Sequence, residues 1–206
     1  MEFRCSTASL AELPCDGLAL GLFSSTWQEQ LRPWAEQLGQ PLLELLEKRQ
    51  FKGKPGELVS LQLPGLQPSL LLLAGLGEPE NFDGVAPRLG AAQLAKASSG
   101  QGCSQLALAL PLEGFAPASA AAALVQGVRL ALFQDQRFRS EPEPRQLPSS
   151  TWLLGLSEEL GAEVLRNQAI CAGVELAREL VAAPPQRGEF PEPGGHGPHP
   201  GQGLPA

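Results

Sequence analysis

The stretch Ser69–Ala74, which reads SLLLLA, decides the fold class of this chain. Its apolar run predicts a central strand that is covered on both faces. Gly75 and Gly77 follow, and we expect them to end this strand before a helix over Ala86–Ser98. A buried strand, a glycine turn and a helix in succession indicate an α/β domain.

The same alternation continues on both sides of this stretch. Further strands are predicted over Glu2–Ser6, Asp16–Phe23, Leu58–Leu63, Gln105–Leu110 and Thr151–Leu156. Further helices are predicted over Ser25–Leu38, Pro41–Arg49, Pro117–Phe133 and from an N-cap at Ser157 to about Ala182. The fold we predict is therefore α/β, with a mixed sheet of about six strands flanked by helices. The last helix carries an apolar stripe of Ile170, Val174, Ala177 and Val181.

Composition excludes several classes of function. The chain has 206 residues, of which 43% are hydrophobic, enough for one domain with a substantial core. Its 22 acidic and 15 basic residues give a net charge of −7, which disfavours nucleic acid as a partner. The apolar runs are too short for a signal peptide or a membrane span, so we expect no membrane partner and a cytoplasmic location.

The cysteines and histidines point to no catalytic centre. The four cysteines form no CxxC pair and are predicted to be buried or half-buried thiols in a reducing compartment: Cys5, Cys15, Cys103 and Cys171. Both histidines, His196 and His199, lie within the last eleven residues. They have the spacing of a two-ligand metal clip, but a tail between glycines and prolines gives them no further ligands. A histidine-centred site in the globular part is excluded.

Two segments resemble binding loops but are better explained as turns. Ala74–Glu80 (AGLGEPE) lies between a strand and a helix, as a phosphate loop would. Glu80 stands where the third glycine of GxGxxG belongs, and its carboxylate would repel a pyrophosphate. Lys48, Lys52 and Lys54 form a small basic cluster that we interpret as a solvated turn.

The carboxylates are too dispersed to suggest acid–base or metal chemistry. Glu158 and Glu159 are neighbours on a helix and point in different directions, while Glu141 and Glu143 lie in a stiff EPEP loop. The three aspartates fall in separate elements and predict no binuclear metal centre: Asp16, Asp83 and Asp135.

Several segments together resemble one known family. They are DGLALGLF (Asp16–Phe23), GKPGELVSLQLPG (Gly53–Gly65), LLLLAGLGE (Leu70–Glu78), ALVQGVRLALFQDQRFRSE (Ala123–Glu141) and GVELARELVAAPP (Gly173–Pro185). Their order and spacing are similar to the N-terminal domain of the leucyl aminopeptidases, the cytosol aminopeptidase family. The resemblance covers roughly residues 1–185.

The resemblance implies a macro-domain-like fold beside the catalytic domain of a hexameric aminopeptidase. That family domain binds two divalent cations, Mn or Zn, through motifs such as GKGxTFDSGG and NTDAEGR. These 206 residues contain neither motif. No catalytic, cofactor-binding or metal-binding residue is therefore assigned, and we expect this chain to be inactive alone. Peptide substrates are expected only through the family's catalytic domain.

Two alternatives stay open: a free-standing ligand-binding or assembly module, and an interaction protein that joins intact aminopeptidase subunits or copies of itself.

The domain division follows from the same comparison. We expect an N-terminal domain over residues 1–156, a linker helix over 157–183, and a disordered tail over 184–206. The tail holds seven prolines and six glycines among 23 residues, a composition that cannot offset its ordering entropy. The tail can be written with codons that, when read with the frame moved by one base, encode the family's APPNVV continuation in place of the tail. The tail is therefore interpreted as a frameshift product, from a mutation or a sequencing error, which truncates the family sequence.

Overall fold

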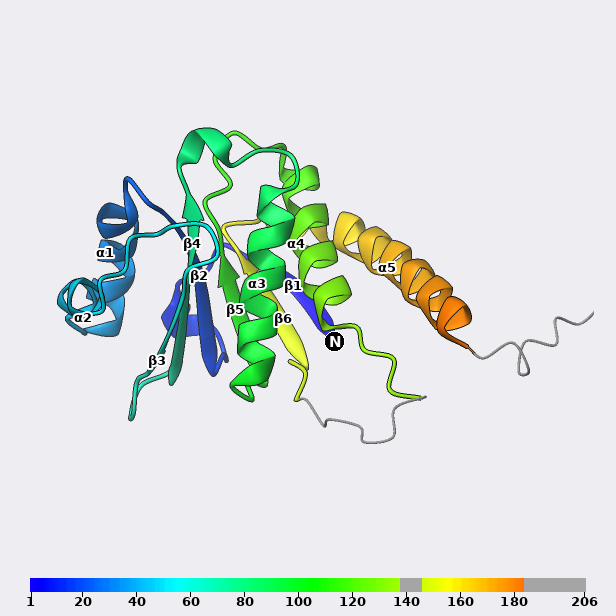
Figure 1. Ribbon diagram of the computed structural model, residues 1–206, viewed down its shortest axis with the longest axis horizontal. Coiled ribbons are helices and arrows are strands. Elements are labelled where there is room, and N and C mark those ends of the chain that lie inside the picture. Colours follow the sequence, from blue (N-terminus) through cyan, green and yellow to red (C-terminus); the bar gives the residue numbers. More distant parts are fainter. Residues whose placement is uncertain (138–145, 184–206) are drawn as a thin grey trace, which may run out of the picture.

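A computed structural model describes residues 1–137 and 146–183, and these form a single six-stranded sheet covered by helices (Figure 1). The strands are β1 (Glu2–Ser6), β2 (Gly17–Phe23), β3 (Leu58–Gln62), β4 (Leu70–Gly77), β5 (Gln105–Ala109) and β6 (Ser150–Leu154). Their order across the sheet is β1-β6-β5-β2-β4-β3. All pairs are parallel except β3 with β4, which is antiparallel, so the mixed α/β sheet predicted from the sequence is confirmed.

Helices cover both faces of this sheet. They are α1 (Trp27–Leu38), α2 (Leu42–Lys48), α3 (Ala86–Gly100), α4 (Pro117–Leu132) and α5 (Gly161–Ala182). Figure 1 shows α1 and α2 on one face and α3 and α4 on the other. α5 starts beside α4 and extends away from the sheet (Figure 1). No helix among the residues described has both the length and the apolar character needed to cross a membrane.

The apolar run Leu70–Ala74 lies in β4 and is buried on both sides. Leu70 and Leu72 pack in the core under α3 and α4, whereas Leu71 and Leu73 pack in the core under α1 and α2. Alternate residues of a strand point to opposite faces, so a fully apolar strand supplies both cores at once. Full burial of each leucine contributes about 1.5–3 kcal/mol relative to an exposed one.

The expected strand end at Gly75 is wrong, because β4 continues to Gly77. The amide of Gly75 donates to the Glu57 carbonyl at 2.8 Å, and the amide of Gly77 donates to the Gly53 carbonyl at 2.9 Å. A Cβ at Gly75 would overlap the Lys54 carbonyl oxygen. The glycines therefore let the 51–57 loop cross close to the strand and extend its pairing.

Asp16 fastens the two central parallel strands at their amino ends. Its carboxylate accepts hydrogen bonds from the amides of Ser104 and Gln105, at 2.9 and 2.8 Å, and from the Cys103 thiol at 3.0 Å. Burial raises the pKa of Asp16, but these donors outweigh it and hold the pKa below its ordinary value. The Asp16 side chain thus joins the first residues of β2 to the first residues of β5.

Candidate functional site

The sheet topology creates a crevice at the carboxyl ends of β2 and β5. β2 leads to α1 and α2 on one face, and β5 leads to α4 on the other face. Chain connections that diverge from adjacent parallel strands leave an opening there, the switch point at which α/β proteins bind ligands. A cavity of about 410 Å³ occupies this position, and we name it the switch-point cleft.

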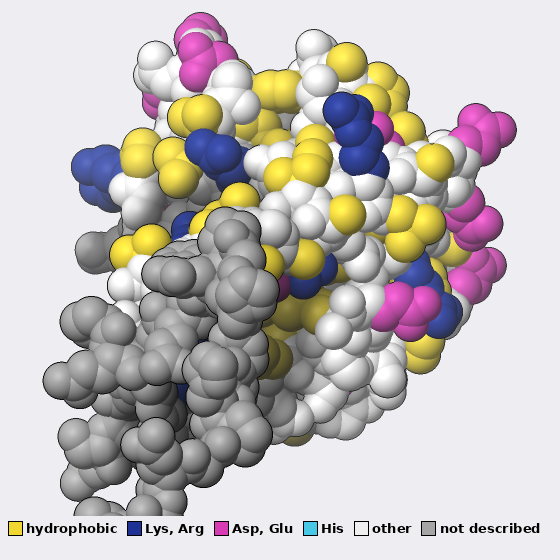
Figure 2. Space-filling view, turned by 90° about the vertical axis from the view of Figure 1, so that its right-hand side faces the viewer, with side chains coloured by type: hydrophobic (Ala, Val, Ile, Leu, Met, Phe, Trp, Pro, Cys, Tyr) yellow, Lys and Arg dark blue, Asp and Glu magenta, His cyan; other side chains and the backbone are white. Residues whose placement is uncertain are grey.

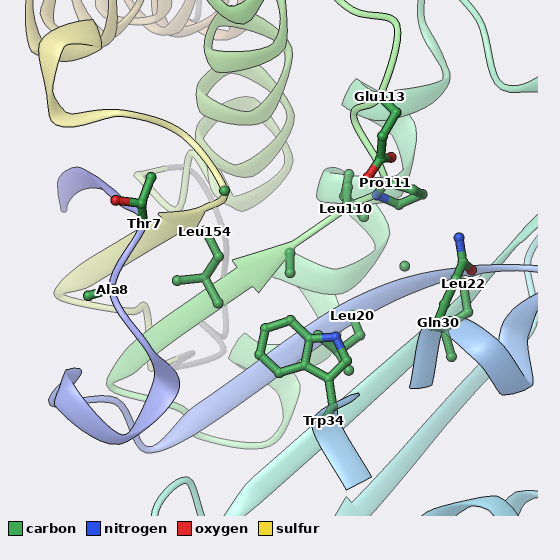
Figure 3. Close-up of a pocket in the computed structure, with 13 residues that line it drawn as sticks. Thr7, Ala8, Leu20, Leu22, Gln30, Trp34, Leu110, Pro111, Glu113 and Leu154 are labelled. Carbon is green, nitrogen blue, oxygen red and sulfur yellow. The ribbon is translucent and has the colours of Figure 1, made fainter. Parts of the chain in front are cut away.

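The carboxyl ends of β2, β5 and β6, the segment after β1, and α1 supply the residues that surround the switch-point cleft (Figure 3). Leu20 and Leu22 come from β2, while Gln30 and Trp34 lie one turn apart on α1. Figure 3 shows the Trp34 ring on one side of the hollow and Glu113, from the segment after β5, on the opposite side. The Gln30 side-chain oxygen accepts the amide of Phe23 at 2.8 Å, which fixes this side chain against the end of β2.

The cleft carries no catalytic constellation among its described lining residues. Glu113 is the single ionisable side chain among the residues that line it, and it is exposed. A nucleophile and its activating base normally lie within hydrogen-bond reach of each other, and the described lining holds no such pair.

The second candidate surface is the outer side of α5. Polar contacts join α5 to α4: Arg129 binds Glu175, the Gln126 amide donates to Asn167 at 2.8 Å, and Arg178 donates to the Leu130 carbonyl at 3.1 Å. The inner side of α5 also buries two apolar side chains, Val164 and Cys171. The hydrophobic side chains of α5 lie largely on the opposite side, and we call the following residues the outer α5 face: Leu165, Ile170, Leu176, Leu180 and Val181. Leu180 is 60% exposed and Val181 is 88% exposed.

Figure 2 looks onto the side of the molecule from which α5 extends, and hydrophobic side chains appear there among charged ones. The apolar stripe predicted for this helix is exposed at Ile170 and Val181, while Val174 is half-buried. A helix usually turns its apolar side to its own domain. α5 buries only Val164 and Cys171 of its hydrophobic side chains against the domain and leaves the outer α5 face exposed to solvent.

The segments that resemble binding loops have structural roles. Ala74–Glu80 forms the end of β4 and a short 3-10 turn, and its Glu78 carboxylate accepts the Ser24 hydroxyl at 2.7 Å. Lys52 and Lys54 are exposed, and their backbone amides donate to the Glu57 carboxylate. The interpretation as a solvated turn is confirmed for Lys52 and Lys54, whereas the exposed Lys48 is the last residue of α2.

The dispersed carboxylates do not come together. Glu158 and Glu159 line two different hollows, as neighbours on one turn should. Within 1–137 and 146–183, no group of three His, Cys, Asp or Glu side chains is arranged to hold a metal ion. The described residues therefore do not fit a metal centre. The pairs Glu141/Glu143 and His196/His199 lie outside the described residues, as does the tail.

The predicted burial of the cysteine thiols is confirmed, since all four are free and buried. Sequence reasoning missed the cleft residues Gln30, Trp34 and Glu113. The sequence did contain a signal for them. Each of these residues lies about three to eleven positions after the carboxyl end of a predicted strand. The helices that follow those strands could lie on opposite faces of the sheet, which is the arrangement that opens a switch-point crevice.

Comparison with known proteins agrees with this architecture. The family model described as "Cytosol aminopeptidase family, N-terminal domain" matches residues 19–142. The probable cytosol aminopeptidase of Synechococcus sp. (strain RCC307) is 56% identical over 185 residues, which cover 90% of this chain and 37% of that protein. A mutant of tomato leucine aminopeptidase superimposes with a TM-score of 0.77 at 27% identity, over 89% of this chain and 38% of the tomato chain. The bottromycin maturation enzyme BotP, solved in complex with Mn, shares the fold at 22% identity with a TM-score of 0.58, over 82% of this chain and 32% of its own.

A chain with this sheet, this terminal helix and these relatives is an aminopeptidase N-terminal domain. It belongs to the cytosol aminopeptidase family and corresponds to the N-terminal part of that family's proteins. The chain spans about 37% of the length of the curated relative it matches.

Proposed function

We propose that this chain acts as the non-catalytic N-terminal module of a leucyl-type, metal-dependent aminopeptidase in the cytosol. In this proposal the family's catalytic part supplies both divalent cations, Mn or Zn, and the contacts with peptide substrates. The module itself has no peptidase activity. The observation that carries the proposal is α5, whose inner side binds the domain through hydrogen bonds and buried side chains, while the outer α5 face stays exposed.

The outer α5 face suits the catalytic part as its partner. It lies at the end of the domain that leads toward the sequence the relatives have beyond the matched region. Covering leucine and valine side chains that are 60% and 88% exposed would remove apolar surface from water, at about 25 cal/mol per Å². We further propose the division into a domain over 1–156, a linker helix over 157–183 and a frameshifted tail over 184–206.

The first test is an activity assay on the 206-residue chain. Leucine p-nitroanilide with added Mn²⁺ should give no turnover above the buffer rate, and appreciable turnover would overturn the proposal. The second test co-expresses this chain with the remainder of the Synechococcus relative. We expect the two to co-purify, and a double variant, Leu180→Gln with Val181→Gln, should abolish co-purification while the domain stays folded.

The proposal that residues 184–206 result from a frameshift is tested separately. Sequencing the gene past the codon for Pro185 should show the metal-binding motifs in the shifted frame. Their absence from that frame would remove the frameshift interpretation.

The alternative is a free-standing ligand-binding module, and the switch-point cleft is the observation that favours it. A ligand that occupies the cleft would raise the melting temperature of the isolated chain. An interaction protein that joins intact subunits, or copies of itself, would instead co-purify with a complete aminopeptidase of the family.

A further inference from the structure

The switch-point cleft has the chemistry of a cation site. Leu20, Leu22 and Leu154 give it apolar walls, the Trp34 ring borders it (Figure 3), and Thr7 and Gln30 add polar lining without charge. Glu113 is its ionisable group, and no lysine or arginine is among the described residues that line it. A carboxylate and an indole ring on opposite sides of a partly apolar hollow favour a positive charge, by direct attraction and by cation–π interaction.

A neighbouring hollow strengthens this charge preference. It has a volume of about 560 Å³, shares Thr7, Leu110 and Glu113 with the switch-point cleft, and adds Glu159. Its described lining also contains no lysine or arginine. Two adjoining hollows at the switch point therefore have carboxylates at their edges and no basic side chain among their described lining residues.

An anion is the competing ligand, because α4 begins beside the second hollow and a helix N-terminus attracts negative charge. Two features weaken that attraction. The first helical residue is Pro117, which has no N–H to donate, and Glu113 lies four residues before it. A phosphate group bound beside this helix would share the hollow with the Glu113 carboxylate, which repels it.

We propose that the switch-point cleft binds a small organic cation, an ammonium or guanidinium group on a short apolar stem. The stem would lie against Leu20, Leu22 and Trp34, and the charged group would lie between the Trp34 ring and the Glu113 carboxylate. This site is independent of the outer α5 face, so it can be tested whether or not the chain joins a catalytic part.

The test is an NMR titration of the 206-residue chain with 3-methylbutylammonium. The chain has three tryptophans, so three indole N–H resonances report binding, and Trp34→Phe assigns the one in the cleft. The neutral isostere, 3-methylbutan-1-ol, has the same stem without the charge. We expect saturable shifts of the Trp34 resonance with the ammonium, a dissociation constant on the order of millimolar, and binding of the alcohol at least about fivefold weaker.

Two variants separate this site from general surface charge. Glu113→Gln should weaken the ammonium about fivefold, while Glu44→Gln, an exposed site on α2, should leave it unchanged. Equal binding of alcohol and ammonium would contradict the proposal, as would equal effects of the two variants. Saturation of the Trp34 resonance by inorganic pyrophosphate in place of the amine would assign the cleft to anions and overturn it.

Discussion

Arg129 on α4 holds Glu175 on α5 through two parallel hydrogen bonds, Nε to Oε1 at 2.8 Å and Nη2 to Oε2 at 2.7 Å. The third guanidinium nitrogen, Nη1, donates to the Gln168 carbonyl at 2.9 Å. Both charged side chains are largely shielded, with 25% and 19% of their surface exposed. This forked contact fixes the direction in which α5 leaves the domain.

Replacing Arg129 should loosen α5 more than it unfolds the domain. Arg129→Met removes the fork and leaves Glu175 partly buried without a partner, so we expect a loss of about 1–2 kcal/mol in unfolding free energy. Hydrogen exchange over residues 161–182 should accelerate. Arg166→Met is the matched control, because Arg166 is 72% exposed and makes a longer contact of 3.6 Å with Glu163. Equal exchange in the two variants would show that the fork does not position α5.

Asp16 should govern stability at low pH. Hydrogen bonds lower its pKa below the ordinary 3.8, so its contribution is present above that pH and is lost as the pH falls through the lower, folded value. Asp16→Asn should cost about 2 kcal/mol at pH 7 and flatten the fall in stability below pH 4. Urea denaturation across this range measures both effects. Asp83→Asn, at an exposed aspartate, should change neither, and a similar loss in both variants would argue against the role of Asp16.

Two helical glycines should respond to alanine with opposite signs. A Cβ at Gly127 on α4 would overlap the Arg88 carbonyl and lie 2.9 Å from the Ala91 Cβ, so Gly127→Ala should destabilise the domain by about 2–3 kcal/mol. Gly173 on α5 has nothing within 4 Å of that position. Gly173→Ala should therefore stabilise the helix by up to about 1 kcal/mol. Denaturant titration compares them, and a neutral Gly127→Ala would mean that α3 and α4 can separate at little cost.

The four thiols should resist labelling until the domain unfolds. Burial raises the pKa of Cys15 to about 11, and burial and the Asp16 contact raise the pKa of Cys103 still further. Ellman's reagent at pH 8 should therefore label none in the native chain and all four in guanidinium chloride. Rapid labelling of one thiol, located by mass spectrometry, would instead identify a segment that opens locally.

The sequence was sufficient where local pattern and tertiary packing agree. Burial determines where the apolar strand β4 lies and which side of each covering helix faces the sheet. The positions of these elements could therefore be predicted from the hydrophobic pattern. The end of β4 was predicted wrongly at Gly75, because this glycine does not form a turn. It leaves space for the backbone of the 51–57 loop, which is distant in sequence. The cleft could not be found from any one segment, since Trp34 and Glu113 come together only when β2 and β5 become neighbours. The Arg129–Glu175 fork joins residues 46 positions apart and leaves no local signal.

The polar attachment of α5 also has a consequence for the order of events during synthesis. α5 is the last described element to leave the ribosome, and its docking site on α4 is complete before it appears. Because the fork and the Gln126–Asn167 bond do not use the outer α5 face, the helix can dock early and hold its leucines and valine in place. A nascent chain built in this way presents a preformed template to whatever polypeptide follows it, and in the absence of such a polypeptide it presents the same surface to chaperones and proteases.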